Sequence, residues 1–221
     1  MSGAAAGLEE AARLHWREDA SARTLRRDGR RWTAWTTWIV LVFCAPAALL
    51  VAIEPWTFPV AAICLLHAWA IPSIQARRGA RQPVPIGSER SAARRGDGDA
   101  RPERVALGLL GDLLGHRERE LLADSGLAMQ AGELGIWLLG EQGALLLRPN
   151  GRRVDCWCVR VAELAELPAG DRVAHLLLAL RADELGFAKV ANLGFSGASW
   201  RVRRHLDQRS RRALALARAD A

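Results

Sequence analysis

Residues 35–74 read WTTWIVLVFCAPAALLVAI, EPWT and FPVAAICLLHAWAIPSI in succession, two apolar stretches separated by only four residues. The hydrocarbon core of a bilayer is about 30 Å thick, and about 20 apolar residues in a helix cross it. The first stretch, 35–53, carries no charge and has this length. The second, 58–74, is shorter and spans when the polar residues beside it lie at the interfaces. The sequence therefore predicts a transmembrane helical hairpin within residues 32–76.

The distribution of charge and tryptophan separates this hairpin from other structures that apolar stretches form. A helical hairpin in the core of a soluble domain normally keeps charge on its outer face, whereas neither stretch contains Asp, Glu, Lys or Arg. A cleaved signal peptide has a short charged leader, whereas the leader here runs to residue 31. Tryptophan occurs near the ends of the two stretches, at positions 32, 35, 38, 56 and 69. This placement is typical of the aromatic belt at a membrane interface.

Arginine flanks the hairpin on both outer sides and is absent from the connecting residues. Five arginines precede the first stretch and three follow the second, namely Arg23, Arg26, Arg27, Arg30 and Arg31, then Arg77, Arg78 and Arg81. Loops rich in Lys and Arg stay on the cytoplasmic side of a membrane. We therefore expect a multi-pass protein of the bacterial cell (inner) membrane, with two spans and both termini in the cytoplasm.

The basic charge of the chain is concentrated beside the hairpin. The 221 residues carry a formal net charge of +7, and of 31 basic residues only Lys189 is a lysine, a skew typical of a GC-rich bacterial genome. Anionic lipid attracts each basic residue near its surface by about 1 kcal/mol. We therefore expect the bilayer and anionic lipid headgroups as partners. We do not expect nucleic acid, because the basic segments lack interleaved aromatic residues and match no nucleic-acid-binding module.

Composition divides the chain into five parts around the hairpin. A basic cytoplasmic leader, 1–31, precedes it. A basic segment, 77–101, follows it and has almost no large apolar residues, so that burial cannot offset the entropy of ordering and a flexible linker is predicted. Residues 102–206 are long enough for one small cytoplasmic domain. Residues 207–221 form a basic tail, which we interpret as a frayed helical extension.

The domain is predicted to be α+β, with an antiparallel sheet of three to four strands packed by helices. Three strand patterns cover residues 134–139, 144–148 and 153–161, and a fourth strand is expected at 189–193. Asn150-Gly151 between the second and third strands is a strong hairpin signal. Helical patterns cover 105–114, 118–123 and 172–185, and a further helix begins near Trp200.

Cys156 and Cys158 lie two residues apart on a predicted strand and therefore face the same side. A disulfide framework is not expected in the cytoplasm, but two thiolates on one face are compatible with metal binding or a redox role. No second cysteine pair or nearby histidine completes the four ligands of a zinc site. We therefore expect these cysteines to be packed in the domain, and we expect no metal and no cofactor.

The segment Gly194-Phe-Ser-Gly-Ala198 is the most chemically suggestive part of the domain. Between a predicted strand and helix it superficially resembles the nucleophile elbow of α/β-hydrolases. Only 25 residues follow Ser196, however, too few for the units that supply the acid and histidine of that fold. Backbone amides at a helix start beside basic side chains instead favour phosphate or carboxylate binding. The candidate anion-binding residues are Ser196, Ser199, Arg201, Arg203 and Arg204.

His67 is an ionisable side chain within the second apolar stretch. Such a group at membrane depth is expensive and often serves proton or ligand binding. The alternative is a neutral imidazole that bonds a backbone carbonyl of the partner helix, which we favour because neither stretch contains an acidic residue for a proton relay.

These features predict a non-enzymatic integral membrane protein that tethers a small cytoplasmic interaction or ligand-sensing domain. Its partner would be an unidentified protein or an anionic small molecule. One alternative is a membrane-anchored enzyme that uses Cys158, His175 or Ser196, and convergence of these groups in one cleft would favour it. Another is a subunit of an oligomeric channel or transporter, in which His67 would face a wet interface.

Overall fold

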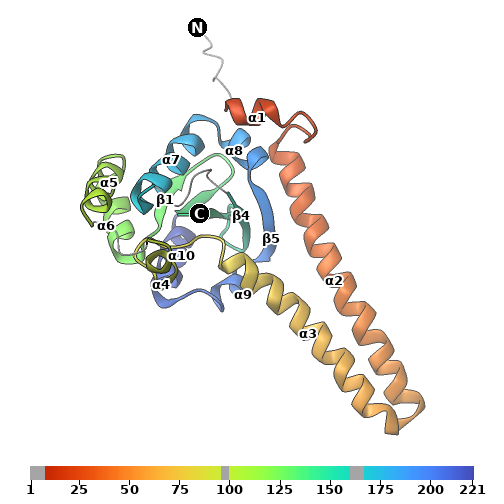
Figure 1. The fold of residues 1–221 in the computed structure, drawn as a ribbon. Helices are drawn as coiled ribbons and strands as arrows, with labels where there is room; N and C mark the ends of the chain where they lie inside the picture. The colour runs from red at the N-terminus through yellow and green to blue at the C-terminus, as the bar shows by residue number, and fades with distance from the viewer. Residues whose placement is uncertain (1–7, 96–99, 160–166) are drawn as a thin grey trace.

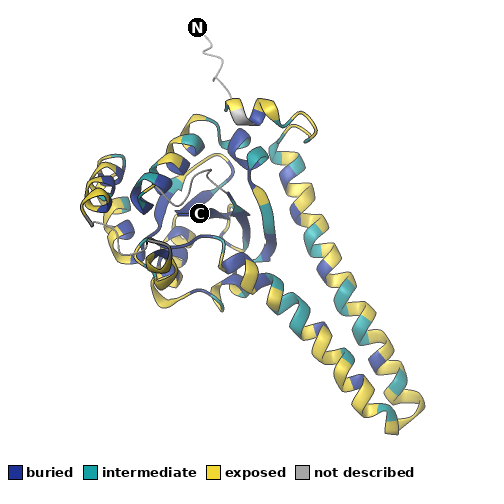
Figure 2. Cartoon of the chain, viewed as in Figure 1, coloured by how far each residue is buried: buried dark blue, intermediate teal, exposed yellow. Residues whose placement is uncertain are grey.

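Two long helices form a hairpin that extends away from an α+β domain (Figure 1). The computed structural model describes residues 8–95, 100–159 and 167–221. Helix α2 (Ala22–Ile53) and helix α3 (Phe58–Ala80) are joined by the short 3₁₀ helix η1 (Pro55–Thr57). Only 11% of the most apolar window of each helix is buried, and large apolar side chains are exposed along the hairpin (Figure 2). A core helix of a soluble protein would be mostly buried, so both helices have the length, composition and exposure that a membrane span requires.

Helix α2 begins well before its apolar stretch because a capping box starts it. The hydroxyl of Ser21 accepts a hydrogen bond from the backbone N–H of Thr24 at 3.1 Å, and the hydroxyl of Thr24 accepts one from the backbone N–H of Ser21 at 2.8 Å. These bonds satisfy donors that have no partner inside the helix. Helix α3 likewise continues beyond its apolar stretch to Ala80. The hairpin therefore reaches the domain as continuous helix on both sides.

The two helices pack antiparallel along their length. The Thr36 hydroxyl lies 3.3 Å from Oε1 of Gln75, where it can donate a hydrogen bond across the interface. Three buried alanines allow close approach of the helices, Ala47, Ala61 and Ala68. Small residues of this kind are typical of helix packing in membranes, where dispersion contacts replace the hydrophobic effect.

The domain is built on a five-stranded antiparallel meander in the order β1-β2-β3-β4-β5. The strands are β1 (Ala128–Ala131), β2 (Ile136–Gly140), β3 (Gly143–Leu147), β4 (Arg153–Cys158) and β5 (Asn192–Ala198). Between β3 and β4 the N–H of Gly151 donates to the carbonyl oxygen of Arg148 at 3.0 Å, and Asn150 and Gly151 have φ of 75° and 63°, which asparagine and glycine tolerate in turns. The predicted α+β class with an antiparallel sheet is therefore confirmed, with one strand more than the sequence predicted.

The fourth predicted strand is shifted along the sequence. The pattern predicted 189–193 as strand and 194–198 as a turn, whereas β5 includes all of 194–198. Phe195 pairs with Cys156 and Ser196 pairs with Asp155, and both residues of β5 are buried. The two glycines of this segment conceal the strand pattern, because glycine is unfavourable in strands. Strand β4 ends at Cys158, and residues 160 and 161 of the predicted strand lie outside the described residues.

Helices cover both faces of the sheet, which explains why every residue of β2 and β3 is buried. Helices α5 (Ala100–Asp112), α7 (Ala169–Ala182) and α8 (Glu184–Val190) join a core with Trp137 and Trp157. Helices α9 (Ser199–Arg203) and α10 (Gln208–Ala219) join the opposite core with Leu138 and Phe195. Helix α6 (His116–Ser125) contributes to both cores, and the short helix α1 (Glu9–Arg13) packs against α8.

The predicted linker, 77–101, differs from a flexible tether in the structure. Its first residues complete α3, and its later residues form helix α4 (Glu89–Arg95). Between them Val84 is buried and its carbonyl accepts a hydrogen bond from the N–H of Glu141 at 2.9 Å. Pro83 and Pro85 are also buried, and the N–H of Ile86 donates to the carbonyl oxygen of Gly126 at 2.9 Å, so this part of the segment packs on the domain. Residues 96–99 lie outside the described residues.

The predicted tail, 207–221, is a packed helix. Asp207 caps α10 by accepting a hydrogen bond from the N–H of Ser210 at 2.8 Å. Ala213, Leu214 and Ala217 of this helix are buried in the core. Small alanines give a weak hydrophobic pattern but allow a helix to lie close to its neighbours.

Helices α2 and α3 hold the edge strand β5 between them. A Cβ atom on Gly29 of α2 would lie 2.8 Å from Oγ of Ser196. A Cβ atom on Gly79 of α3 would lie 2.5 Å from Cβ of Phe195. Because consecutive strand residues point to opposite faces, the two helices contact opposite faces of β5. The hairpin thus covers an edge that would otherwise expose unpaired backbone groups.

Candidate functional site

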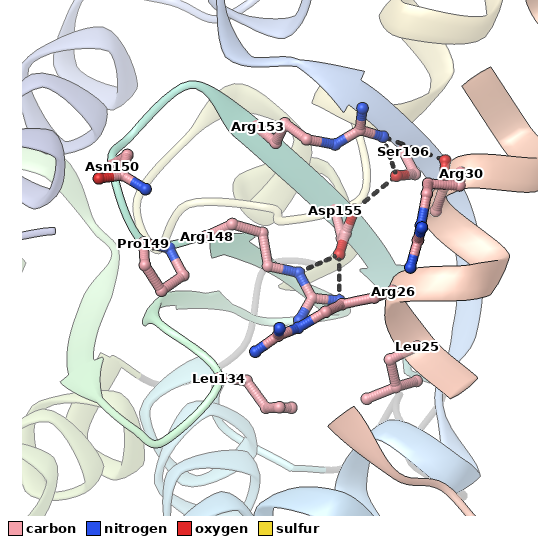
Figure 3. Close-up of a pocket in the computed structure, with 11 residues that line it drawn as sticks. Leu25, Arg26, Arg30, Leu134, Arg148, Pro149, Asn150, Arg153, Asp155 and Ser196 are labelled. Carbon is pink, nitrogen blue, oxygen red and sulfur yellow. Dashed lines mark hydrogen bonds and ion pairs between the residues drawn. The ribbon is translucent and has the colours of Figure 1, made fainter. Parts of the chain in front are cut away.

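A cavity of about 510 Å³ lies where α2 meets the sheet (Figure 3). This volume is within the range of small-molecule sites in proteins. We call it the arginine cavity, and its lining residues are Leu25, Arg26, Gly29, Arg30, Leu134, Arg148, Pro149, Asn150, Arg153, Asp155 and Ser196. One wall is the first two turns of α2, and the other is formed by β4, β5 and the turn before β4.

Asp155 on β4 is the buried centre of the cavity wall. Its Oδ2 accepts hydrogen bonds from Nε and Nη2 of Arg148, both at 2.7 Å. Its Oδ1 accepts a hydrogen bond from the Ser196 hydroxyl at 2.6 Å. A buried carboxylate is tolerated only with such partners, so these contacts fix the Arg148 side chain in place.

Arg153 connects the same wall to the α2–α3 hairpin. Its Nη2 donates to the carbonyl oxygen of Gly29 at 3.0 Å and to the hydroxyl of Thr33 at 2.7 Å. The same nitrogen lies 3.4 Å from Oγ of Ser196. Only a residue without a side chain allows α2 to pass this close to the sheet, which accounts for Gly29.

The charge of the cavity is strongly unbalanced. Its lining contains four arginines and one aspartate, a formal excess of three positive charges. Arg26 and Arg30 are one helical turn apart on α2, are exposed, and make no hydrogen bond or ion pair within residues 8–95, 100–159 and 167–221. Guanidinium groups hold phosphate and carboxylate through paired, charge-assisted hydrogen bonds. The arrangement can therefore bind a small anion between α2 and the sheet.

The structure separates the five residues predicted to bind an anion. Ser196 lines the arginine cavity, whereas the buried Ser199 donates its hydroxyl hydrogen to the carbonyl oxygen of Gly151 at 2.9 Å. Arg201 and Arg204 face a different groove, beside α3, and Arg203 is exposed. Helix α9 has only five residues, too few to form the helix N-terminus that the prediction required. The five residues therefore do not form one site.

The sequence prediction missed the arginines of α2 and of the β3–β4 hairpin. Arg26 and Arg30 are spaced for one helix face, and Arg153 and Asp155 are spaced for one strand face, so each pair was visible locally. More than one hundred residues separate the two pairs. Nothing in the local pattern showed that α2 would fold back onto β4.

His67 is exposed and is tied to its own helix. Its Nδ1 lies 2.8 Å from the carbonyl oxygen of Ile63, within hydrogen-bond distance, and its ring stacks on Phe43 of α2 with centroids 5.4 Å apart. The bonded carbonyl belongs to the same helix, whereas the sequence interpretation placed it on the partner helix.

The groups considered for catalysis lie apart. Cys158 is half-buried at the end of β4, His175 is exposed on α7, and Ser196 lines the arginine cavity. No hydrogen bond joins any two of them within the described residues. Cys156 is buried, and burial together with the neighbouring Asp155 carboxylate raises the pKa of its thiol well above its ordinary value. In the described part of the chain, no group of three or more His, Cys, Asp or Glu side chains is arranged to hold a metal ion.

Comparison with protein-family models, with curated proteins and with solved structures finds no match to this chain. The residues and geometry described above are therefore the basis of any functional assignment.

Proposed function

We propose that this chain is a two-span protein of the bacterial inner membrane, with both termini in the cytoplasm, whose α+β domain senses a small anionic ligand. The ligand would carry a phosphate or carboxylate group and would bind in the arginine cavity. The observation that carries the proposal is the composition of that cavity, in which Arg26 and Arg30 of α2, which have no partner among the described residues, face Arg153 of β4 and Arg148 just after β3.

Binding there has a mechanical consequence. An anion that neutralises guanidinium groups on both walls stabilises the arrangement in which α2 lies on the sheet. The anion shifts the protein toward this arrangement to the extent that it binds more tightly there than when α2 lies away from the sheet. The Arg153 bonds to Gly29 and Thr33 already favour contact between the same walls. Because α2 continues unbroken to Ile53, a change in its tilt relative to the sheet would be felt across the whole span.

The topology is supported by the arginines that flank the two spans and are absent from the connecting residues. A membrane-impermeant maleimide tests it. With Cys44, Cys64, Cys156 and Cys158 replaced by alanine, we expect Glu54→Cys to be labelled in intact spheroplasts. Ala221→Cys should be labelled only after the membrane is permeabilised. Labelling of Ala221→Cys in intact spheroplasts would contradict the orientation.

Thermal unfolding of the full-length protein in detergent tests the arginine cavity. Inorganic pyrophosphate and inorganic phosphate serve as probes, compared with chloride at equal ionic strength. Because a ligand that binds only the folded state stabilises it, we expect pyrophosphate to raise the Tm. The Arg26→Gln/Arg30→Gln variant should lose this increase.

The matched control removes the same charge from the same helix. Arg23 and Arg27 are exposed on α2 and do not line the arginine cavity. The Arg23→Gln/Arg27→Gln variant should therefore keep the increase in Tm. An equal loss in both variants would show that pyrophosphate senses only overall charge, and no increase in the wild-type protein would contradict binding of phosphate-type anions.

A further inference from the structure

A second cavity, of about 520 Å³, opens between α2, α3 and α9. We call it the headgroup groove and define it by Val40, Trp69, Pro72, Trp200, Arg201 and Arg204, which are among its lining residues. Its lining also includes Thr33 of α2, whose hydroxyl accepts a hydrogen bond from Arg153 of the arginine cavity at 2.7 Å. None of its lining residues is an aspartate or a glutamate.

The two ends of this groove differ in polarity. Val40, Trp69 and Pro72 belong to the two apolar stretches, and Trp69 is 69% exposed. The other end is formed by Arg201, Arg204 and the neighbouring His205 of the domain. One cavity therefore runs from membrane depth to a cluster of basic groups at the level where the spans end.

The basic end lacks a negative partner. Nη2 of Arg201 donates to the carbonyl oxygen of Pro72 at 2.8 Å, and its guanidinium lies 5.6 Å from the centroid of the Phe195 ring. The guanidinium of Arg204 stacks over Trp200, 4.6 Å from the ring centroid. Neither arginine forms an ion pair with a described carboxylate. Burial lowers the pKa of Arg201, which expresses the unfavourable energy of a desolvated cation without a counter-charge.

Tryptophan marks the level of the groove. Trp200 of the domain is 55% exposed, and Trp35 and Trp38 of α2 are similarly exposed. Exposed tryptophans gather at the boundary between hydrocarbon and headgroups. The α9 segment therefore adds a domain residue to the aromatic belt of the hairpin, and its arginines lie where lipid phosphates lie.

From this combination we propose that the headgroup groove binds one anionic phospholipid. The lipid phosphate would lie against Arg201 and Arg204, and an acyl chain would follow Val40 and Trp69. A free phosphate does not account for the apolar half of the groove, and a zwitterionic lipid brings no net charge to the unpaired arginines. The inference rests on the membrane placement of α2 and α3, but not on the arginine cavity.

Native mass spectrometry of the full-length protein in dodecyl maltoside tests this. Dioleoylphosphatidylglycerol and dioleoylphosphatidylcholine are titrated separately, and the bound lipids are counted. We expect the anionic lipid to saturate one tight site that the zwitterionic lipid does not fill. Removal of one arginine at an anionic lipid surface corresponds to about a fivefold change in affinity. Arg204→Gln should therefore weaken the anionic lipid about fivefold, and Arg201→Gln/Arg204→Gln about 25-fold.

The Arg204→Gln variant should fold normally even if the double variant does not. Arg204 is exposed, and its side chain bonds no backbone group among the described residues. The matched control is Arg203→Gln/Arg212→Gln, which removes two exposed arginines from the same region outside the groove. This control should retain the affinity within about twofold, since distant exposed charges are screened.

Each other outcome has a definite meaning. If the lipid affinity fell equally in the control variant, the effect would reflect overall charge alone, and the proposed site would be overturned. Equal binding of phosphatidylcholine would show an apolar groove without headgroup recognition. Complete displacement of the lipid by millimolar inorganic phosphate would identify a free-anion site and overturn the lipid assignment. The Arg26→Gln/Arg30→Gln variant should keep its lipid, so failure of the groove and failure of the arginine cavity are distinguished.

Discussion

The contact between α3 and β5 predicts that Gly79→Ala destabilises the protein, although alanine favours helices. The new Cβ would lie 2.5 Å from Cβ of Phe195 and 3.0 Å from Sγ of Cys156, whereas carbon atoms pack at about 3.5–4.0 Å. Phe195 is fully buried and its Cβ is fixed to the strand, so either α3 or β5 must move. Such overpacking costs about 1–3 kcal/mol.

Helix propensity opposes this effect by at most about 1 kcal/mol, and by less at Gly79 because α3 ends one residue later. The expected net loss is about 1–2 kcal/mol of unfolding free energy. Urea unfolding of the detergent-solubilised protein, followed by pulse proteolysis, measures it. With a urea m-value of about 2 kcal/mol/M, the midpoint should fall by about 0.5–1 M.

Gly108 provides the control with the same chemical change and the opposite expected sign. It lies within α5, and an added Cβ would meet nothing within 4 Å. Gly108→Ala should therefore stabilise the protein by about 0.5–1 kcal/mol, because alanine restricts the unfolded chain more than glycine does. If Gly79→Ala raised the midpoint as Gly108→Ala does, α3 would not pack on Phe195, and the continuous connection between hairpin and sheet would be refuted.

Three further predictions concern single residues of the domain. Asp155→Asn leaves the partly buried Arg148 without its carboxylate partner, so the unfolding free energy measured in urea should fall by about 3 kcal/mol. The control, Asp124→Asn on the exposed face of α6, should change that free energy by less than about 0.5 kcal/mol. In a variant that lacks Cys44 and Cys64, maleimide should label Cys158 in the native state. Cys156 should be labelled only after denaturation, because its thiol is buried and has a raised pKa. Rapid labelling of Cys156 in the native state would contradict its burial. Burial, and then the charges of Arg77 and Arg204, lower the pKa of His205, so its NMR signals should titrate below about pH 6.5. Because the unfolded chain takes up the proton more readily, the stability of the folded protein should fall as the pH drops through that range. Arg204→Gln should raise the pKa of His205.

The hairpin and the β3–β4 turn were predictable because their signals are local. The absence of charge over 35–53 favours an apolar environment for that helix, and asparagine and glycine tolerate positive φ through their own conformational preferences. The start of α2 was not predicted, because Thr24 takes the position at which a capping box normally has Glu or Gln.

The edges of the domain were not predictable in the same way. Strand β1 has only four residues, and β5 contains Gly194 and Gly197, so their strand character depends on pairing with β2 and β4. Val84 and Ile86 are apolar residues in an otherwise polar segment, and their backbone groups bond Glu141 and Gly126, which are distant in sequence. The arginine cavity was not predictable for the same reason, because α2 and β4 are far apart in the sequence and meet only through tertiary packing.

Strand β5 contributes Ser196 to the arginine cavity, and its Phe195 contacts Arg201 of the headgroup groove. Ser196 points to the arginine cavity, and the adjacent Phe195 points to α3, where Arg201 of the headgroup groove lies over its ring. The pairing of both residues with β4 fixes their relative positions, so β5 cannot tilt at one site without moving at the other. Two ligands whose sites bias the same element alter each other's affinity by the same factor. If ligands in the two proposed sites each displaced β5, their binding would be linked through this strand without any contact between the two ligands.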